Sequence, residues 1–218
     1  MATATKSRIG ANGSEPSEQI QIVSLNIREF DLPIRGVTPL ITHKKSQAMK
    51  DKIETKEQGK ATGGRKKRNP LQECKDAIYL MPGSTGPDSK KAEYGLPAAG
   101  FKNGAVAACR YIEGMKMVSI KGAFRVLDDG GGLVRMKTKS GWKMRDDWTI
   151  IGQGVPHLKY RPEFEDWSCI LRIIYNASSM SAEQIINLFN YAGFHVGWGE
   201  LRPQQGYSNG MYEVVTKK

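Results

Sequence analysis

The chain has 218 residues, of which 39% are hydrophobic and 25% charged, and this composition excludes a wholly disordered protein. Its 33 Lys and Arg against 22 Asp and Glu give a formal net charge of +11, which favours a polyanionic partner such as nucleic acid over the alternative of a soluble basic protein without one. The three cysteines are far apart and odd in number. They predict a reducing compartment rather than a disulfide framework or a zinc site.

The first residues are small and polar. Residues 1–17 therefore predict a flexible tail, and we expect a single domain over residues 18–218. The sequence shows neither the apolar core of a signal peptide nor an apolar run as long as a membrane span. We expect a cytoplasmic protein without a membrane partner.

A strand is predicted near the start of this domain. Apolar residues alternate over 20–34, with a change of parity that suggests a bulge or a bend. Pro33 and Pro39 bracket the next few residues. Because proline cannot donate to a sheet ladder, we expect the strand to end there, at an edge or in a turn.

Most of the excess positive charge lies in the segment that follows. Residues 44–68 hold ten basic and three acidic side chains, a local excess of seven. We expect a charged helix over 46–58, a mobile 59–69, and a basic insertion over 44–70 that contacts phosphates, with a solvated loop as the alternative. The cations of this insertion proposed to bind nucleic acid are Lys44, Lys45, Lys60, Arg65, Lys66, Lys67 and Arg68.

The middle of the chain predicts two strands. Apolar residues alternate over 115–127, which predicts a strand with a cationic face that carries Lys121 and Arg125. Residues 128–132 contain three glycines and predict a turn into a second basic strand over 133–139. The cationic face is proposed to line a nucleic-acid groove.

Aromatic and basic residues are mixed further on. Residues 142–148 are expected to form a loop in which Trp142, Lys143 and Arg145 contact nucleic acid, with the tryptophan stacking on a base. Residues 167–175 are apolar on both parities except for one arginine, which predicts a central strand.

The C-terminal segment combines a helix with a glycine-rich loop. Ser181 and Gln184 have the spacing of a capping box, and the helix that they begin is expected to end at Gly193. In the loop, glycines that let a backbone approach a ligand alternate with groups that hold phosphates or stack on bases. A strand is expected over 211–216. The loop residues proposed to contact nucleic acid are Gly197, Trp198, Gly199, Arg202, Gly206, Tyr207 and Gly210.

The order of predicted elements fits an α+β fold with a ferredoxin-like, or RRM-like, βαββαβ core. Three segments also make the sequence similar to the RAMP superfamily, the repeat-associated RNA-binding proteins of CRISPR systems. They are Gly36-Val37-Thr38-Pro39-Leu40, the helix start Leu96-Pro97-Ala98-Ala99-Gly100-Phe101-Lys102, and the terminal Gly197-Trp198-Gly199 with Gly206-Tyr207-Ser208-Asn209-Gly210-Met211-Tyr212-Glu213-Val214.

The resemblance implies a C-terminal glycine-rich loop that contacts RNA and a basic insertion similar to the thumb of the backbone-forming members. The short chain and its basic insertion also resemble a phage-encoded nucleic-acid-binding protein, which implies a bacterial or phage-infected cell. No RNP motif is present, so the stacking aromatics of RRM proteins are not carried over.

The histidines raise the question of catalysis. RAMP-like ribonucleases use a histidine general base without metal, and the resemblance would give that role to His43; a phosphate-contacting or exposed histidine is the favoured alternative. His195 is expected to be packed. Adjacent acids in loops are usually solvated, so we expect no metal site and no cofactor.

These patterns predict a non-catalytic protein that binds single-stranded RNA or DNA, RNA ahead of DNA, with copies assembling along the strand or within a CRISPR or phage nucleoprotein complex. One alternative is a metal-independent endoribonuclease of the same fold that uses His43. The other is a phage assembly or inhibitor protein that binds an acidic protein. The main prediction requires 44–68 and 197–210 to lie on the same side of the molecule.

Overall fold

A computed structural model describes residues 24–60, 67–151 and 154–216. The predicted tail, and Arg65 and Lys66 of the basic insertion, lie outside the described residues. The strands are β1 (Ile27–Gly36), β2 (Leu40–Ile41), β3 (Tyr94–Pro97), β4 (Phe124–Leu127), β5 (Leu133–Lys137), β6 (Lys143–Ile151), β7 (Val155–Phe164), β8 (Ser168–Asn176) and β9 (Tyr212–Val214). The α-helices are α1 (Gln47–Glu57), α2 (Pro70–Asp76), α3 (Ala98–Ala108), α4 (Met117–Ala123) and α5 (Ala182–Tyr191). The shorter turns are η1 (Cys109–Tyr111), η2 (Ala192–Val196, a π-helix) and η3 (Pro203–Gln205).

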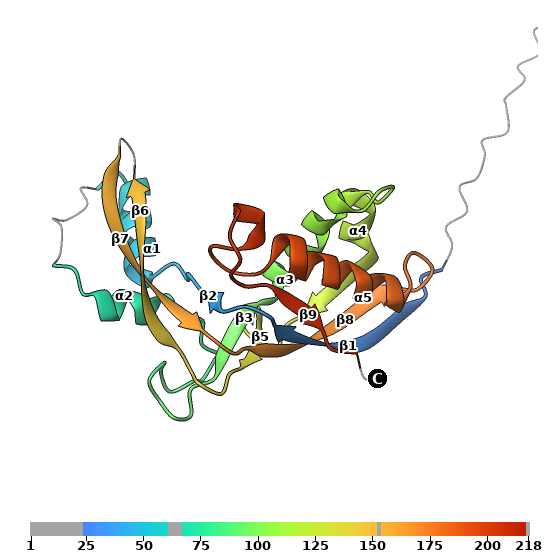
Figure 1. The fold of residues 1–218 in the computed structure, drawn as a ribbon, viewed down its shortest axis with the longest axis horizontal. Coiled ribbons are helices and arrows are strands. Elements are labelled where there is room, and N and C mark those ends of the chain that lie inside the picture. Colours follow the sequence, from blue (N-terminus) through green and yellow to red (C-terminus); the bar gives the residue numbers. More distant parts are fainter. Residues whose placement is uncertain (1–23, 61–66, 152–153, 217–218) are drawn as a thin grey trace, which may run out of the picture.

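The main sheet has the antiparallel order β3-β5-β8-β1-β9, with β4 also paired to β8. Both β4 and β5 run along β8 in the same direction, so they act as one interrupted strand. Read in this way, β9-β1-β8-β4/β5 is the strand order of a βαββαβ unit whose two helices are α3 and α5. Figure 1 shows these helices over one face of the sheet and no helix over the other. The prediction of an α+β fold with an antiparallel sheet is confirmed.

The core lies between the main sheet and its helices. Leu32 and Ile34 of β1 and Leu171 and Ile173 of β8 are all at most 1% exposed, because alternate residues of neighbouring strands share the covered face. Residues 168–176 form the central strand, as predicted. On the uncovered face, Ile170 is 50% exposed.

Helix α5 begins where the sequence predicts. The Ser181 hydroxyl accepts from the amide of Gln184 and the Gln184 side chain accepts from the amide of Ser181, which satisfies two amides that a helix start leaves free. The α-helix ends at Tyr191, close to the predicted stop at Gly193, and the chain continues as the π-turn η2. A Cβ at Gly193 would lie 1.9 Å from the carbonyl oxygen of Tyr212, so this glycine allows β9 to approach the helix.

A second sheet, β2-β7-β6, forms a side lobe with α1 and α2 (Figure 1). We define the side lobe as the described residues of 40–76 and 143–164. The predicted charged helix is present as α1, and Ser46 caps its first turn. Helix α2 is held against β7 by Arg68, whose Nη2 donates to the carbonyl oxygen of Leu158 at 2.6 Å. The basic insertion therefore belongs to a folded lobe whose other half lies about ninety residues later in the sequence.

The predicted strand over 115–127 is largely wrong. Residues 117–123 form α4, and only Phe124–Leu127 is a strand. Ile120 and Ala123 are buried while Val118 is 81% exposed, which is a helical spacing of buried residues. Lys121 consequently lies on a helix, so no cationic strand face exists there.

One further expectation was wrong. Residues 143–148, expected as a loop, belong to β6, which forms with β7 a hairpin that the sequence did not predict.

Strand β1 ends at Gly36, between Pro33 and Pro39 as expected. The carbonyl oxygen of Pro33 accepts from the amide of Val215, so its missing N–H faces the end of β9, beyond the last paired residue of that ladder.

Candidate nucleic-acid interface

Two hollows share His43 as a lining residue. The first, of about 470 Å³, lies between the glycine-rich loop, α3 and the chain after β2. Its lining residues are His43, Tyr79, Pro97, Gly100, Asn103, Gly104, Ala107, Val196, Gly197, Trp198, Gly199, Glu200, Arg202 and Gln204. The second, of about 390 Å³, lies inside the side lobe and is lined by His43, Lys44, Lys45, Ser46, Met49, Arg68, Glu73, Asp76, Ala77, His157, Lys159 and Tyr160. We call the two hollows together the His43 groove.

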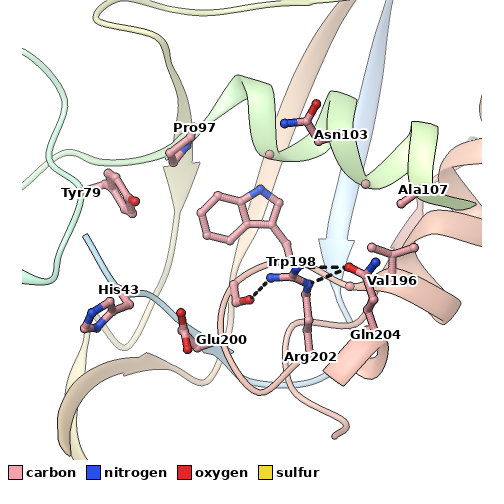
Figure 2. A pocket seen from close by; sticks show the side chains of 14 residues that line it. His43, Tyr79, Pro97, Asn103, Ala107, Val196, Trp198, Glu200, Arg202 and Gln204 are labelled. Atoms are coloured by element: carbon pink, nitrogen blue, oxygen red, sulfur yellow. Dashed lines mark hydrogen bonds between the residues drawn. The ribbon is translucent and has the colours of Figure 1, made fainter. Parts of the chain in front are cut away.

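The glycine-rich loop presents Arg202 to the first hollow. The Arg202 Nη1 donates to the carbonyl oxygen of Gly199 at 2.9 Å, and Nη2 donates to Oε1 of Gln204 at 3.1 Å (Figure 2). Both partners are neutral. The guanidinium is therefore held in place while its charge stays available to an anion.

His43 lies where the two hollows meet. Burial lowers the pKa of His43 below its usual 6.5; the nearby carboxylate of Glu200 acts in the opposite direction, while Arg161 and Lys159 lower the pKa further. The imidazole is consequently neutral near pH 7. A neutral imidazole can accept a hydrogen bond or a proton from a bound hydroxyl.

Four cations, Lys44, Lys45, Arg68 and Lys159, and two acids, Glu73 and Asp76, line the second hollow. Arg68 pairs with Glu73 at 2.7 Å and its guanidinium carbon lies 5.3 Å from the centre of the Tyr160 ring. Lys44, Lys45 and Lys159 form no ion pair with any acid in the described part of the chain. These three ammonium groups are available to phosphates.

A buried arginine connects the side lobe to the glycine-rich loop. Arg161 of β7 is 3% exposed, and its Nη1 donates to Oδ2 of Asp147 at 2.9 Å while Nη2 lies 3.7 Å from Oε2 of Glu200. Its Nε has no hydrogen-bond partner among the described residues. Arg161 thus holds the Glu200 carboxylate at the wall of the groove, next to His43.

Several glycines of the loop serve packing rather than the approach of a ligand. Gly199 has φ +89°, and a Cβ there would lie 2.3 Å from the carbonyl oxygen of Ile41. Gly210 has φ +69°, and its Cβ would lie 1.8 Å from the carbonyl oxygen of Trp198. These glycines let the loop fold onto itself and onto β2.

Trp198 is a core residue. Its side chain is only 7% exposed, and it packs on α3 so closely that a Cβ at Gly100 would lie 2.5 Å from its Nε1. The expectation that Trp198 is a stacking platform for bases is therefore wrong. The sequence suggested exposure because the tryptophan stands between two glycines, whereas those glycines make room for its burial.

The structure brings part of the predicted site together. The loop lines the first hollow, Lys44, Lys45 and Arg68 of the insertion line the second, and His43 lines both; that 44–68 and 197–210 lie on the same side of the molecule stays a prediction. The predicted residues that line the His43 groove are His43, Lys44, Lys45, Arg68, Gly197, Trp198, Gly199 and Arg202. The described ones that line neither hollow are Lys60, Lys67, Lys121, Arg125, Trp142, Lys143, Arg145, Gly206, Tyr207 and Gly210.

Some of the excluded residues have structural roles. The Arg125 Nη1 donates to the carbonyl oxygen of Lys121 at 3.0 Å and so closes the end of α4. Trp142 donates from Nε1 to the carbonyl oxygen of Pro87 at 3.0 Å. Lys143 pairs with Glu165 at 2.7 Å, and Arg145 pairs with Asp147, so neither cation of β6 is unpaired.

Sequence reasoning missed several residues of the groove. They are Tyr79, Asn103, Glu200, Gln204, His157, Lys159 and Tyr160. The β7 residues could have been found only by recognising the β6–β7 hairpin. Tyr79 and Asn103 carry no local signal, because they reach the groove through long-range packing.

The described residues contain no group of three His, Cys, Asp or Glu side chains that could hold a metal ion. None of the described helices combines the length and the apolar character that crossing a membrane requires.

Comparison with known proteins finds likenesses among solved structures only. No protein-family model matches the sequence, and no curated protein matches it. Among solved structures, Cmr6 from Pyrococcus furiosus is similar over 88% of this chain and 100% of its own length, with a TM-score of 0.39 and 9% identity. At 9% identity no residue role transfers from one chain to the other.

Proposed function

We propose that this protein binds single-stranded nucleic acid, RNA ahead of DNA, in the His43 groove, as a subunit of a RAMP-like complex. One observation carries the proposal: His43 lines both hollows, so the glycine-rich loop and the base of the basic insertion border one groove. The resemblance of the sequence to RNA-binding RAMP proteins supports RNA over DNA.

Charge decides what the groove attracts. Lys44, Lys45, Lys159 and Arg202 have no acidic partner among the described residues, whereas Glu200, the acid beside His43, lies near the buried Arg161. Four free cations along one groove suit four backbone phosphates. Lys60 and Lys67 of the side lobe are exposed beyond the groove and add to the positive field.

Salt dependence of binding tests the proposal. Neutralising four phosphates of a single strand predicts a slope of log affinity against log salt of about −3, measured with a fluorescent 20-nucleotide RNA. Changing Lys44, Lys45 or Lys159 to Ala should each make the slope shallower by about 0.7 and weaken binding of all sequences alike.

Lys90→Ala is the matched control, since Lys90 is exposed but lines neither hollow. It should leave both affinity and slope unchanged. A flat salt response of the wild type would contradict the proposal and favour the predicted alternative of an acidic protein partner. The same titration with single-stranded DNA and with duplex RNA measures the preference for single-stranded RNA.

A metal-independent endoribonuclease is a second candidate function, because of the position of His43. A solvent-accessible, neutral imidazole that lines both hollows could accept the proton of a 2′-hydroxyl that attacks the adjacent phosphate. End-labelled RNA incubated with EDTA would show cleavage by the wild type and none by His43→Ala. Equal products from both variants, or none from either, would contradict this second function.

A further inference from the structure

We propose that four aromatic side chains beyond the first hollow form a base-stacking subsite for single-stranded RNA, an inference that rests on the proposed function. The aromatic cluster consists of Tyr111 of η1, Tyr191 at the end of α5, and Phe194 and His195 of the π-turn η2. None of them was predicted to bind nucleic acid, and His195 was expected to be packed.

The rings of the aromatic cluster are organised around His195. Its ring stacks on Tyr111 with centroids 4.4 Å apart and planes 12° apart. Tyr191 lies 5.7 Å away at 29°, and Phe194 meets His195 edge to face at 4.9 Å and 86°.

These rings face solvent. Tyr111 is 48% exposed, Tyr191 43% and Phe194 62%. Aromatic residues of the core, such as Phe101 and Phe189, are completely buried. Exposing three large rings side by side gains nothing for folding, because burial of aromatic surface is what stabilises a core. A flat aromatic ligand that stacks on these rings would bury their exposed faces, and this burial favours binding.

The aromatic cluster lies close along the chain to residues at the far end of the first hollow. Figure 2 shows His43 and Tyr79 at one end of the first hollow and Ala107 and Val196 at the other. Tyr111 follows Ala107 by four residues on the same face of the helical segment, and His195 directly precedes Val196. A strand whose phosphates lie along the cations near His43 would reach the aromatic cluster at the far end of the hollow.

The chemistry selects a base of a single strand as the occupant. Bases of a duplex are stacked on one another and present only their edges, whereas an unpaired base offers a free face to an aromatic ring. Stacking on tyrosine or phenylalanine tolerates every base, since each has a π-face. The subsite therefore adds affinity for single strands without a sequence preference.

The test compares a base-bearing RNA with a probe of equal length and charge that lacks bases. We expect Tyr111→Leu and Phe194→Leu each to weaken binding of the RNA by about fivefold or more and to leave binding of the abasic probe unchanged. Leucine keeps an apolar side chain but removes the ring. Val118→Ala, an exposed apolar position on α4, is the control and should change neither affinity.

The outcomes separate this inference from the proposed function. If the wild type binds neither probe, both fail. If the wild type binds RNA with a steep salt slope but the leucine variants bind RNA equally well, only the stacking subsite is overturned. An equal loss for the two probes also overturns it. Capture of a protein partner by the aromatic cluster, with RNA affinity unchanged in the leucine variants, would assign the rings to a protein interface instead.

Photochemical crosslinking on the wild-type protein tests the subsite without any variant, so its result stands even if a variant fails to fold. RNA that carries 5-iodouridine, irradiated on the wild-type protein, should crosslink to peptides that contain Tyr111, Tyr191 or Phe194. Crosslinks confined to other peptides would contradict the subsite. Thermal unfolding of each variant shows whether a loss of affinity reflects a loss of structure.

Discussion

Substituting two glycines of the C-terminal loop, Gly206 and Gly210, distinguishes the cost of backbone strain from the cost of lost packing. Gly206 has φ +84° and nothing within 4 Å of an added Cβ. Gly210 has φ +69°, and an added Cβ would lie 1.8 Å from the carbonyl oxygen of Trp198. Both positions strain an L-residue similarly, but only one lacks the space for a methyl group.

The expected magnitudes follow from that difference. Gly206→Ala adds only the strain of a left-handed residue, about 1–2 kcal/mol, which lowers the Tm of a chain of this size by about 4 °C. Gly210→Ala adds the same strain and displaces the loop. The displacement loses the 2.8 Å bonds from Trp198 N to Gly210 O and from Gly210 N to Pro39 O, at about 1 kcal/mol each. The sum, about 4 kcal/mol, lowers Tm by roughly 12 °C.

Thermal unfolding followed by circular dichroism measures both changes. At 20 °C, well below either transition, Gly206→Ala should bind RNA as the wild type does. Similar losses of Tm in the two variants would refute the assignment of Gly210 to packing. A normal Tm with abolished RNA binding in Gly206→Ala would instead restore a ligand-contacting role for that glycine.

Three further predictions concern buried groups. All three cysteines are at most 3% exposed, and burial raises the pKa of Cys74 to about 11, so iodoacetamide should modify none of them in the native protein and all of them in urea. Arg161→Ala leaves Asp147 without its buried partner and should lower the free energy of unfolding by about 3 kcal/mol in urea titrations, whereas an unchanged midpoint would contradict the role of Arg161. Because the pKa of His43 is lowered in the folded state, the unfolded chain takes up a proton first; stability should fall as pH drops below 6.5, and His43→Gln should reduce that slope.

Local signals in the sequence predicted the elements that depend on neighbouring residues. The S-x-x-Q spacing at Ser181 marked the start of α5, and the apolar run over 167–175 indicated a central strand. The segment of α4 was misread because Val118, Ile120 and Phe124 alternate like a strand, although Ile120 and Phe124 also fit a helical turn.

The groove could be predicted only in part, because tertiary contacts decide its other half. The hairpin β6–β7 escaped prediction since its exposed face carries apolar residues, such as Trp148 at 77% exposure, while the buried Arg161 interrupts the other face. Burial of Trp198 depends on Gly100, nearly a hundred residues away. The sequence around Gly100 and the sequence around Trp198 contain no pattern that predicts the contact between them.

The pairing of distant segments also sets the order in which the molecule can assemble. Strand β1 finds its partners only when β8 and β9 have been made, more than 130 residues later, and helix α2 waits for β7. During synthesis the positively charged segment between β2 and α2 therefore leaves the ribosome long before the surface that will hold it. Closure of such distant contacts predicts slow folding, with the His43 groove completed last, when the final loop docks on β2.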